Sequence, residues 1–521
     1  MQVIDNTLVL RTRNPEKIQA RIPNSDIVQV SDDIYTMAVG WDLSTAQQLT
    51  RLRMKNIPSP IMRDYEWSGI YAPMGHQKTT AEFLTLNPRA FCFNEQGTGK
   101  TGAAIWASDY LLQQKYIHRV LVICPLSIVY SAWSTDLFSF APHRSVGIAY
   151  GAKEKRKQVI EGDYDYIIIN YDGVNVVKEV IAANGFDLIV IDEANAYKNC
   201  TTKRWKLINK LVTPSTWVWM MTGTPAAQSP VDAHGLAKLC VPDNVTPSKT
   251  RFKDSVMYPV SKFKWVPQPH AQDVVHRTLQ PAIRFTKEQC LDLPEVTYVD
   301  REAPLTLQQK HYYKILREEF IMEAGDEHVT SANVAVNMSK LLQLSGGAVY
   351  SNSGNVVQFD VSNRLKVVKE VIDEAIAKVL IFAPFKHTIE ILYEFLNKTG
   401  IITEYITGDV TLNKRTKLIQ DFQTLPEPRV LVIQPQAAAH GVTLTAANTV
   451  IWYSPITSIE TYLQANARIN RKGQKNVMTV VNIEGSPVER RLYRLLSGRL
   501  EAHVKLLDLY EEIIDKPLDS V

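Results

Sequence analysis

Short, wholly apolar runs that end in a polar or Gly/Pro turn recur along the chain in two groups. The first group comprises "RAFCFN", "VLVICP", "YIIIN", "LIVIDE" and "VWMMTG", and the second comprises "VLIFAP", "VLVIQP", "TVIWYSP" and "MTVVNI". Amphipathic stretches of helical length, such as "TGAAIWASDYLLQQ", separate most of these runs. Strands that are apolar on both faces and alternate with helices are typical of parallel sheets covered on both sides. The pattern therefore predicts two α/β domains.

The strand pattern lapses between residues 226 and 377, where Pro-rich turns and the helical stretch "LTLQQKHYYKILREEFIMEA" take its place. This segment predicts helical insertions and a linker, and the first 66 residues predict a small, separate α+β module. The predicted parts, in chain order, are an N-terminal accessory module (1–66), a first lobe with a helical insertion after about residue 226 (67–290), a linker with a helical insertion (291–365), a second lobe (366–500) and a C-terminal helical tail (501–521).

Composition narrows the class of protein without choosing a function. The 521 residues are 45% hydrophobic and 21% charged, which is ordinary for a soluble multidomain protein. The formal charge of +4 requires that any surface for nucleic acid be a local patch. The five cysteines form no Cys-x-x-Cys pair, and the chain has neither a signal peptide nor an apolar run of membrane-spanning length. We therefore expect an intracellular protein with no disulfide framework, structural zinc or membrane contact.

The stretch "FCFNEQGTGKT" predicts a strand, a glycine turn and a helix that opens at Thr101. Gly97 and Gly99 would let backbone N–H groups approach a phosphate at the positive end of the helix dipole. Lys100 would reach the β- and γ-phosphates of ATP, and the Thr101 hydroxyl would hold Mg²⁺. The strict phosphate-loop pattern has glycine where this chain has Asn94, so the motif alone leaves a chance glycine turn open.

A second element, "FDLIVIDEAN", predicts a buried strand that ends in Asp192 and Glu193. One carboxylate at such a strand end can hold the Mg²⁺ shell, and its neighbour can orient and deprotonate an attacking water. A single acidic residue there is commonly part of a surface turn. An Asp-Glu pair downstream of a phosphate loop favours nucleotide hydrolysis, with Thr101 and Asp192 as metal ligands and Glu193 as the base.

Several motifs stand in a characteristic order along the chain. They are "GHQ" (75–77), "NEQGTGKT" (94–101), "VICPLSIVYSAW" (122–133), "DEANAYKN" (192–199), "MTGTP" (221–225), "GVTLTAANTVIWYSP" (441–455) and "QANARINRKGQ" (464–474). From about residue 70 to 500 the chain resembles the superfamily-two helicases, and most of all the Swi/Snf-type DNA translocases. The resemblance implies an α/β fold of two RecA-like parallel-sheet lobes that close on ATP and Mg²⁺.

Arg468 and Arg471 match the two arginine-finger positions of this family, and their spacing would put them one helical turn apart. The resemblance implies that they approach the γ-phosphate held by Lys100 when the lobes close. An arbitrary pair at this spacing is usually part of a solvated helix face. Gln464 matches the glutamine that opens the finger helix. The resulting catalytic set is Lys100, Asp192, Glu193, Arg468 and Arg471.

Other positions take their roles from the resemblance one at a time. Gln77 matches the glutamine that reads adenine, and its alternative is a place in a surface turn. Thr222 and Thr224 match the motif that links hydrolysis to lobe movement. Gly441 and Thr443 match a second-lobe loop between ATP and nucleic acid. Each of these has a purely structural alternative. The residues expected to contact ATP are Gln77, Gly97, Thr98, Gly99, Lys100, Thr101 and Gly441.

One position departs from the family, which usually has histidine where this chain has Asn195. In the family this histidine is thought to connect the ATP site with the region of Thr222. Asparagine can donate and accept hydrogen bonds but cannot carry charge. We therefore expect hydrolysis to survive the difference, and any loss to fall on its coupling to DNA.

The resemblance also implies contacts with the DNA backbone, which give affinity without sequence preference. Its candidates are Ser127, Asn170, Tyr171, Lys198 and, in the second lobe, Thr443. Two basic clusters, "KEKRK" (153–157) and "VERRLYRLLSGR" (488–499), are further candidates, although such clusters are more often solvated helix faces. Three tryptophans in or near these motifs are candidates for stacking on bases, but core packing is favoured for each: Trp133, Trp205 and Trp452.

The sequence therefore predicts a DNA-stimulated ATPase that tracks along double-stranded or forked DNA and remodels forks, junctions or protein–DNA complexes. No strand-separating wedge is identifiable, but a strand-separating DNA or RNA helicase stays an alternative. A nucleotide-gated DNA-binding protein with vestigial hydrolysis is a third reading, which only Asn195 supports. The N-terminal module resembles accessory domains of fork-remodelling motors and is a candidate for binding a protein partner. The compact chain favours the cytoplasm of a bacterial cell or phage-infected host.

Overall fold

The computed structural model describes residues 1–126, 128–226, 229–260, 265–290, 293–325, 331–350, 356–438, 443–471 and 473–498. The chain divides into two compact units, the first made of Met1–Ala226 and Pro230–Cys290 and the second containing the described residues from 293 onward. Each unit is described by itself. The predicted C-terminal tail lies outside the described residues.

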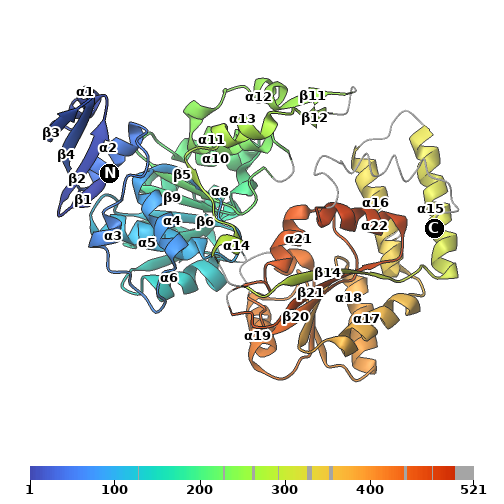
Figure 1. Ribbon diagram of the computed structural model, residues 1–521. Helices are drawn as coiled ribbons and strands as arrows, with labels where there is room; N and C mark the ends of the chain where they lie inside the picture. The colour runs from blue at the N-terminus through green and yellow to red at the C-terminus, as the bar shows by residue number, and fades with distance from the viewer. Residues whose placement is uncertain are drawn as a thin grey trace. The chain divides into compact units, whose positions relative to one another are not determined.

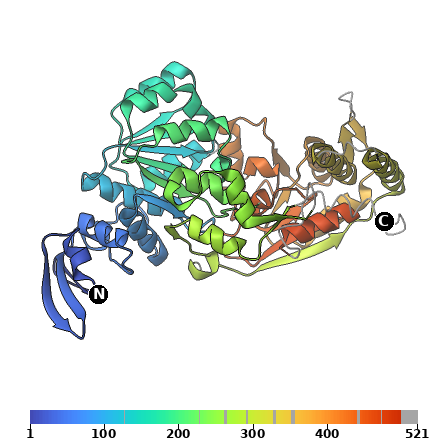
Figure 2. The same ribbon diagram turned by 90° about the horizontal axis from the view of Figure 1, so that it is seen from above.

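The first unit opens with a four-stranded antiparallel sheet of order β1-β2-β4-β3 (Figures 1 and 2, blue). Its side chains belong to one hydrophobic cluster that continues into the helices of the parallel sheet. Two hydrogen bonds strengthen this junction, from Gln47 Nε2 to the Thr85 carbonyl at 2.8 Å and from the Ser59 N–H to Glu82 Oε1 at 2.8 Å. The elements are β1 (Gln2–Ile4), β2 (Thr7–Thr12), α1 (Pro15–Gln19), β3 (Ser25–Ser31), β4 (Ile34–Gly40), α2 (Leu43–Arg51) and α3 (Ile61–Asp64).

A seven-stranded parallel sheet of order β13-β5-β10-β9-β6-β8-β7 forms the body of the first unit. Alternate residues of its central strands enter two separate hydrophobic clusters, as Val122 and Ile123 do, so both faces are buried. This arrangement confirms the predicted parallel sheet. The strands are β5 (Arg89–Cys92), β6 (Val120–Cys124), β7 (Val146–Ala149), β8 (Tyr166–Asn170), β9 (Leu188–Asp192), β10 (Trp217–Met221) and β13 (Ala282–Ile283).

Helices cover both faces of this sheet (Figure 1). The helices of this unit are α4 (Gly75–Leu86), α5 (Lys100–Gln113), the π-helix η1 (Val129–Ser134), α6 (Thr135–Phe140), α7 (Lys153–Glu161), α8 (Tyr171–Val176), α9 (Lys178–Asn184), the 3₁₀ helix η2 (Ala194–Tyr197), α10 (Lys203–Leu211), α11 (Asp232–Cys240), the 3₁₀ helix η3 (Pro242–Asn244), α12 (Lys249–Val256), α13 (Ala271–Thr278) and α14 (Lys287–Cys290); it also contains a hairpin of β11 (Met257–Pro259) and β12 (Trp265–Pro267).

The second unit is built on a six-stranded parallel sheet of order β14-β21-β20-β17-β19-β18, which confirms the second α/β domain. Its strands also divide their side chains between two hydrophobic clusters. The strands are β14 (Val296–Glu302), β17 (Lys378–Phe382), β18 (Thr403–Ile406), β19 (Val430–Ile433), β20 (Ala447–Trp452) and β21 (Met478–Glu484).

Six helices accompany this sheet and a helical insertion follows β14 (Figure 1). The six are α17 (Ser362–Glu374), α18 (Lys386–Lys398), α19 (Leu412–Thr424), α20 (Pro435–Ala438), α21 (Ile459–Asn466) and α22 (Pro487–Leu496); the insertion has α15 (Leu307–Gly325), α16 (Ser331–Gly346) and a hairpin of β15 (Ala348–Tyr350) and β16 (Val356–Gln358). Among the described residues, no helix is apolar over a length that would cross a bilayer.

The prediction that strands lapse between residues 226 and 377 was wrong: besides the hairpins β11–β12 and β15–β16, this segment adds one edge strand to each parallel sheet. The seven residues of β14 pair in full register with β21 at the edge of the second sheet, and β13 adds a short edge to the first. An edge strand keeps one side accessible to solvent and needs no continuous apolar run. Most residues of β14 are exposed, so the apolar pattern of the inner strands is missing there.

A buried ion pair holds the second unit together where α17, α22 and the end of β20 meet. Arg364 donates to Glu489 Oε2 at 2.7 Å and to the Tyr453 carbonyl, and its side chain is 3% exposed. The same carboxylate oxygen accepts the N–H groups of Gly485 and Ser486, which caps α22. A buried charge that keeps its partner and its hydrogen bonds is tolerated, whereas a single one left behind is costly.

We expect Glu489→Ala to destabilise the second unit by about 3–5 kcal/mol, because it leaves the Arg364 charge buried without its carboxylate. Urea unfolding followed through the second unit measures this. Glu394→Ala is the matched control, since Glu394 pairs with Lys398 on an exposed helix face and should change stability by less than about 0.5 kcal/mol. Equal midpoints for the two variants would contradict the expectation.

Candidate ATP site

Three turns that carry the predicted chemistry leave the first sheet side by side. Strand β10 lies between β5 and β9, and all three are parallel. Met221 at the end of β10 pairs with Cys92 on one side and Asp192 on the other, so the three strands end in register. The carboxyl edge of a parallel sheet is where such folds bind ligands. The phosphate loop, the Thr222–Thr224 turn and the Asp192–Glu193 turn therefore share one edge.

The phosphate loop needs its two glycines for conformational reasons. Gly97 and Gly99 have φ angles of +87° and +79°, where a side chain is disfavoured. A Cβ atom on Gly99 would also lie 2.2 Å from Gln77 Nε2. Helix α5 begins directly afterwards at Lys100, one residue earlier than predicted, so its free N–H groups face the loop.

Side chains from α4 brace this loop. Gln77 is buried, accepts the Met74 N–H at 2.9 Å and donates to the Gly99 carbonyl at 3.2 Å. His76 Nε2 lies 2.7 Å from the Thr98 carbonyl. These contacts tie Gln77 to the loop backbone, and its role in reading adenine stays a prediction.

Inside the loop, two polar side chains turn back to the same carbonyl. Thr98 is fully buried and donates its hydroxyl to the Glu95 carbonyl at 2.7 Å, and Lys100 Nζ lies 3.4 Å from it. Thr98 thus closes the loop on itself. Lys100 is 9% exposed and Thr101 is half-buried in the first turn of α5.

Asn94, which replaces the first glycine of the strict motif, is a buried bridge. Its Nδ2 donates to Thr80 Oγ1 at 2.8 Å, and its Oδ1 accepts the Phe285 N–H at 2.9 Å. It therefore joins α4, the phosphate loop and the segment after β13. Asn94 departs from the motif and, through these two hydrogen bonds, supports the loop.

The Asp192–Glu193 turn has an unusual backbone. Glu193 has a φ of +48°, a region that non-glycine residues seldom occupy. Asp192 is buried; its Oδ2 accepts the Trp133 indole N–H at 2.8 Å and its Oδ1 accepts the Glu193 N–H at 2.9 Å. Gln96 of the phosphate loop donates to Glu193 Oε1 at 3.5 Å. The acidic turn is thereby fixed on two sides and linked to the loop.

The donor set suits Mg²⁺ bound together with ATP. Among the described residues, no group of three or more His, Cys, Asp or Glu side chains lies together as a metal site. Mg²⁺ keeps several waters and uses one or two protein oxygens plus substrate phosphates. The Thr101 hydroxyl and the Asp192 carboxylate are oxygen ligands of that kind.

Asn195 is joined to the turn that follows β10. Its Nδ2 donates to the Thr224 carbonyl at 2.9 Å and lies 3.2 Å from Thr224 Oγ1. The Thr224 N–H in turn donates to Thr222 Oγ1 at 3.3 Å, and the Thr222 N–H donates to the Cys92 carbonyl beside the phosphate loop at 3.1 Å. An uncharged asparagine thus makes the link from the acidic turn to the Thr222–Thr224 turn.

In the second unit, the arginine-finger candidates lie beyond α21 and not on it. The helix begins at Ile459 after the Ser458 cap and ends at Asn466; beyond its end, the Leu444 N–H donates to the Arg468 carbonyl. The prediction of two arginines one helical turn apart was therefore wrong, and Gln464 lies in the last turn of α21 instead of opening it.

The side chains of these second-unit residues have defined surroundings. Arg468 is 2% exposed, and Arg471 donates to Thr443 Oγ1 at 3.2 Å. Gln464 is buried and donates to Glu460 Oε1 at 3.3 Å. Gly441 lies outside the described residues. Arg471 and Thr443, whose predicted roles come from separate motifs, are therefore in direct contact.

The predicted DNA contacts of the first unit are largely engaged within the protein. Asn170 Oδ1 accepts Arg156 at 3.0 Å, so the buried Arg156 of the "KEKRK" cluster supports the fold. Lys198 lies 3.4 Å from the carboxylate of Asp232. The Tyr171 hydroxyl donates to the carbonyls of the acidic turn, a role that its motif did not predict. Ser127 lies outside the described residues.

All three tryptophans weighed as base-stacking candidates are buried, as favoured: Trp133, Trp205 and Trp452. Trp133 has a specific contact that the sequence did not indicate, since no spacing or periodicity relates it to Asp192. Gln96 was missed in the same way, because it stands at an unspecified position of the phosphate-loop motif.

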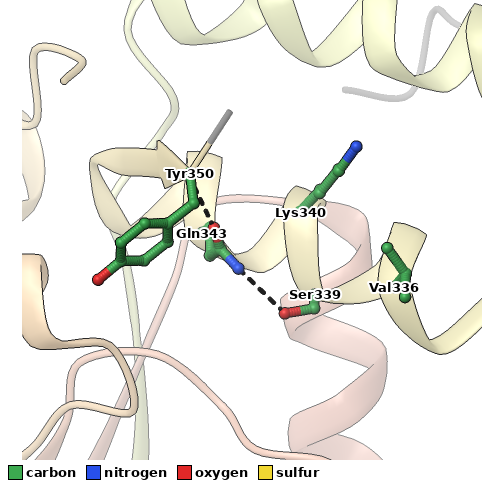
Figure 3. Close-up of a pocket in the computed structure, with 5 residues that line it drawn as sticks. All are labelled: Val336, Ser339, Lys340, Gln343 and Tyr350. Atoms are coloured by element: carbon green, nitrogen blue, oxygen red, sulfur yellow. Dashed lines mark hydrogen bonds between the residues drawn. The ribbon is translucent and has the colours of Figure 1, made fainter. Parts of the chain in front are cut away.

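A pocket of about 310 Å³ in the second unit lies apart from these motifs (Figure 3). Gln343 connects two other lining residues: it donates to Ser339 Oγ at 3.1 Å and accepts the Tyr350 N–H at 3.1 Å. Val336 and Lys340 complete the lining. None of the predicted site residues lines this pocket.

Two family models match this chain. The family model of the SNF2-related domain matches residues 76–346, and that of the helicase conserved C-terminal domain matches residues 363–473. An uncharacterized ATP-dependent helicase of Mycoplasma genitalium is 26% identical over 424 residues, which cover 80% of this chain and 40% of that protein. The chromodomain-helicase-DNA-binding protein 1-like of Mus musculus is 25% identical over 427 residues, covering 78% and 46%.

Among solved structures, the Sulfolobus solfataricus SWI2/SNF2 ATPase core in complex with dsDNA is similar, with 23% identity and a TM-score of 0.41. The match covers 87% of this chain and 97% of that one. The chain spans less than half the length of the two curated relatives described above.

We expect Asn94→Gly, which restores the strict motif, to destabilise the first unit by about 2–4 kcal/mol. The half-buried Phe285 N–H loses its acceptor, Thr80 keeps only its bond to the His76 carbonyl, and a flexible residue enters the loop. Thermal unfolding with and without nucleotide measures this. Asn184→Gly is the control, since the exposed Asn184 also donates to a carbonyl but should cost less than about 1 kcal/mol. A variant as stable as the wild type would show that Asn94 is not a structural bridge.

Proposed function

The chain belongs to the SNF2-related family, and from that premise we propose that it is a DNA-stimulated ATP hydrolase that moves along double-stranded DNA. Its movement would remodel forks, junctions or protein–DNA complexes. The observation that carries the proposal is the alignment of the phosphate loop, the Thr222–Thr224 turn and the Asp192–Glu193 turn at the ends of three neighbouring strands. A nucleotide bound at this edge meets the groups for phosphate binding, water activation and transmission together.

Each group has one proposed part in hydrolysis. Glu193 orients the attacking water and accepts its proton, while Lys100 binds the β- and γ-phosphates. Thr101 and Asp192 would hold Mg²⁺, which when bound supplies positive charge against the phosphate oxygens. Arg468 and Arg471 stabilise the charge that spreads over the transferred phosphoryl group.

Duplex DNA is proposed as the polymer for two reasons. The residues of the motifs resemble those of translocases that track along duplex DNA. One curated relative is named as a DNA-binding protein.

The link from Asn195 to Thr224 and Thr222 offers a route by which the state of the nucleotide reaches the rest of the first unit.

The test is the steady-state ATPase rate without polymer and with duplex DNA, forked DNA, single-stranded DNA and RNA. We expect duplex or forked DNA to stimulate the wild type most. Lys100→Ala and Arg471→Ala should lower the stimulated rate by on the order of 10³-fold or more, as for lost phosphate and arginine-finger contacts. Lys398→Ala, on an exposed helix face, should leave it unchanged.

Two outcomes would replace the proposal. Stimulation mainly by single strands or RNA would favour a strand-separating helicase. A near-zero rate on every polymer would favour a nucleotide-gated binding protein with vestigial hydrolysis.

A further inference from the structure

Two aromatic side chains outside the predicted catalytic set converge on the Asp192–Glu193 turn. The Trp133 indole N–H donates to Asp192 Oδ2 at 2.8 Å. The Tyr171 hydroxyl lies 2.6 Å from the Asp192 carbonyl and 3.1 Å from the Glu193 carbonyl. One residue therefore holds the carboxylate and the other holds the backbone of the same turn.

Trp133 reaches the carboxylate from an irregular helix. It lies in the π-helix Val129–Ser134, which begins two residues after the predicted DNA contact Ser127. π-Helical turns are rare and are frequent at functional sites. The indole is 1% exposed, so it is fixed by packing as well as by its hydrogen bond. A shift of this helix would move the donor on Asp192.

Tyr171 follows β8, the strand that pairs with β6 in the sheet. It is the first residue of α8, directly after β8 ends at Asn170, in the second segment predicted to contact DNA. The Tyr171 hydroxyl donates to both carbonyls of the acidic turn from this position. Its ring is also clamped, with the Arg204 guanidinium 4.9 Å from the ring centre.

The turn they hold has a conformation that needs support. A non-glycine residue at positive φ, such as Glu193, costs on the order of 1–3 kcal/mol and persists only when its surroundings fix it. Loss or displacement of one support can therefore change which conformation the turn adopts. The turn carries the proposed base and a proposed metal ligand, so such a change would alter the rate of hydrolysis.

We propose that Trp133 and Tyr171 are positioning residues that transmit DNA occupancy to the Asp192–Glu193 turn. DNA phosphates bound by the segments after β6 and β8 would shift the π-helix and the start of α8, and each shift would reach the turn through one hydrogen bond. This inference rests on the proposed function, since it concerns how DNA stimulates the same ATP site.

The test compares Trp133→Phe and Tyr171→Phe with two matched controls. Tyr171→Phe removes only the donor, whereas Trp133→Phe removes the donor and also makes the buried ring smaller, a loss that its control reproduces. Trp205→Phe removes an indole N–H that donates to the Gly235 carbonyl at 2.8 Å, in an equally buried position. Tyr197→Phe removes a buried hydroxyl that has no hydrogen-bond partner among the described residues, on a ring 5.6 Å from that of Tyr171.

The main readout is a binding measurement. The Kd for duplex DNA is measured with and without Mg²⁺ and a non-hydrolysable ATP analogue, and the ratio of the two gives the coupling factor. Coupled sites commonly change each other's affinity by about 5–150-fold. We expect the wild type and both controls to fall in that range, and Trp133→Phe and Tyr171→Phe to bring the factor to within about twofold of 1.

Hydrolysis supplies the second readout. In both variants the ratio of DNA-stimulated to DNA-free kcat should fall at least fivefold, while the KM for ATP stays within about twofold. The double variant should lose little more than either single variant, because residues that act through one element are not additive. A residue important only for folding would instead lower both rates and the unfolding temperature together.

The outcomes separate this inference from the proposed function. If the wild type shows neither coupling nor DNA stimulation, the proposed function fails and the inference falls with it. If the wild type couples and the two variants couple equally well, only the inference is overturned. If the variants lose DNA affinity but keep the coupling factor, the two residues are DNA contacts and the inference is also overturned.

Discussion

The shared register of three parallel strands places every turn of the candidate ATP site in the first unit. Because Met221 on β10 pairs with both Cys92 and Asp192, the turns after β5, β10 and β9 have to emerge at the same level of the sheet. No single turn holds all the residues proposed for phosphate binding, water activation and transmission. Fixed backbone spacing between neighbouring strands brings the three turns together at one edge of the sheet.

The site is supported by hydrogen bonds that cross between these turns. Asn94 ties the phosphate loop to α4 and to the segment after β13, and Gln96 joins the loop to Glu193. Asn195 joins the acidic turn to Thr224. The chain thus uses neutral amides at several junctions, including the place where its family usually has histidine. Amides donate and accept without a charge, so these junctions do not depend on a protonation state.

The sequence predicted the inner strands and the phosphate loop well, because runs such as "VLVIC" are buried on both faces and glycine is required at positive φ. It missed the edge strand β14, whose exposed residues break the apolar run. It also placed Gln464 at the start of a helix, whereas Gln464 lies in the last turn of α21. The hydrogen bond from Trp133 to Asp192 could not be predicted from the sequence, since its partners are 59 residues apart and Trp133 lies in a π-helix.

The most direct measurement is displacement of a third strand from a triplex placed on duplex DNA. A motor that tracks along an intact duplex removes the third strand, with ATP and Mg²⁺ required, and leaves the two duplex strands paired. The account predicts that result for the wild type. Separation of the duplex strands, or ATP hydrolysis with the triplex left in place, would contradict the claim that this protein moves along double-stranded DNA.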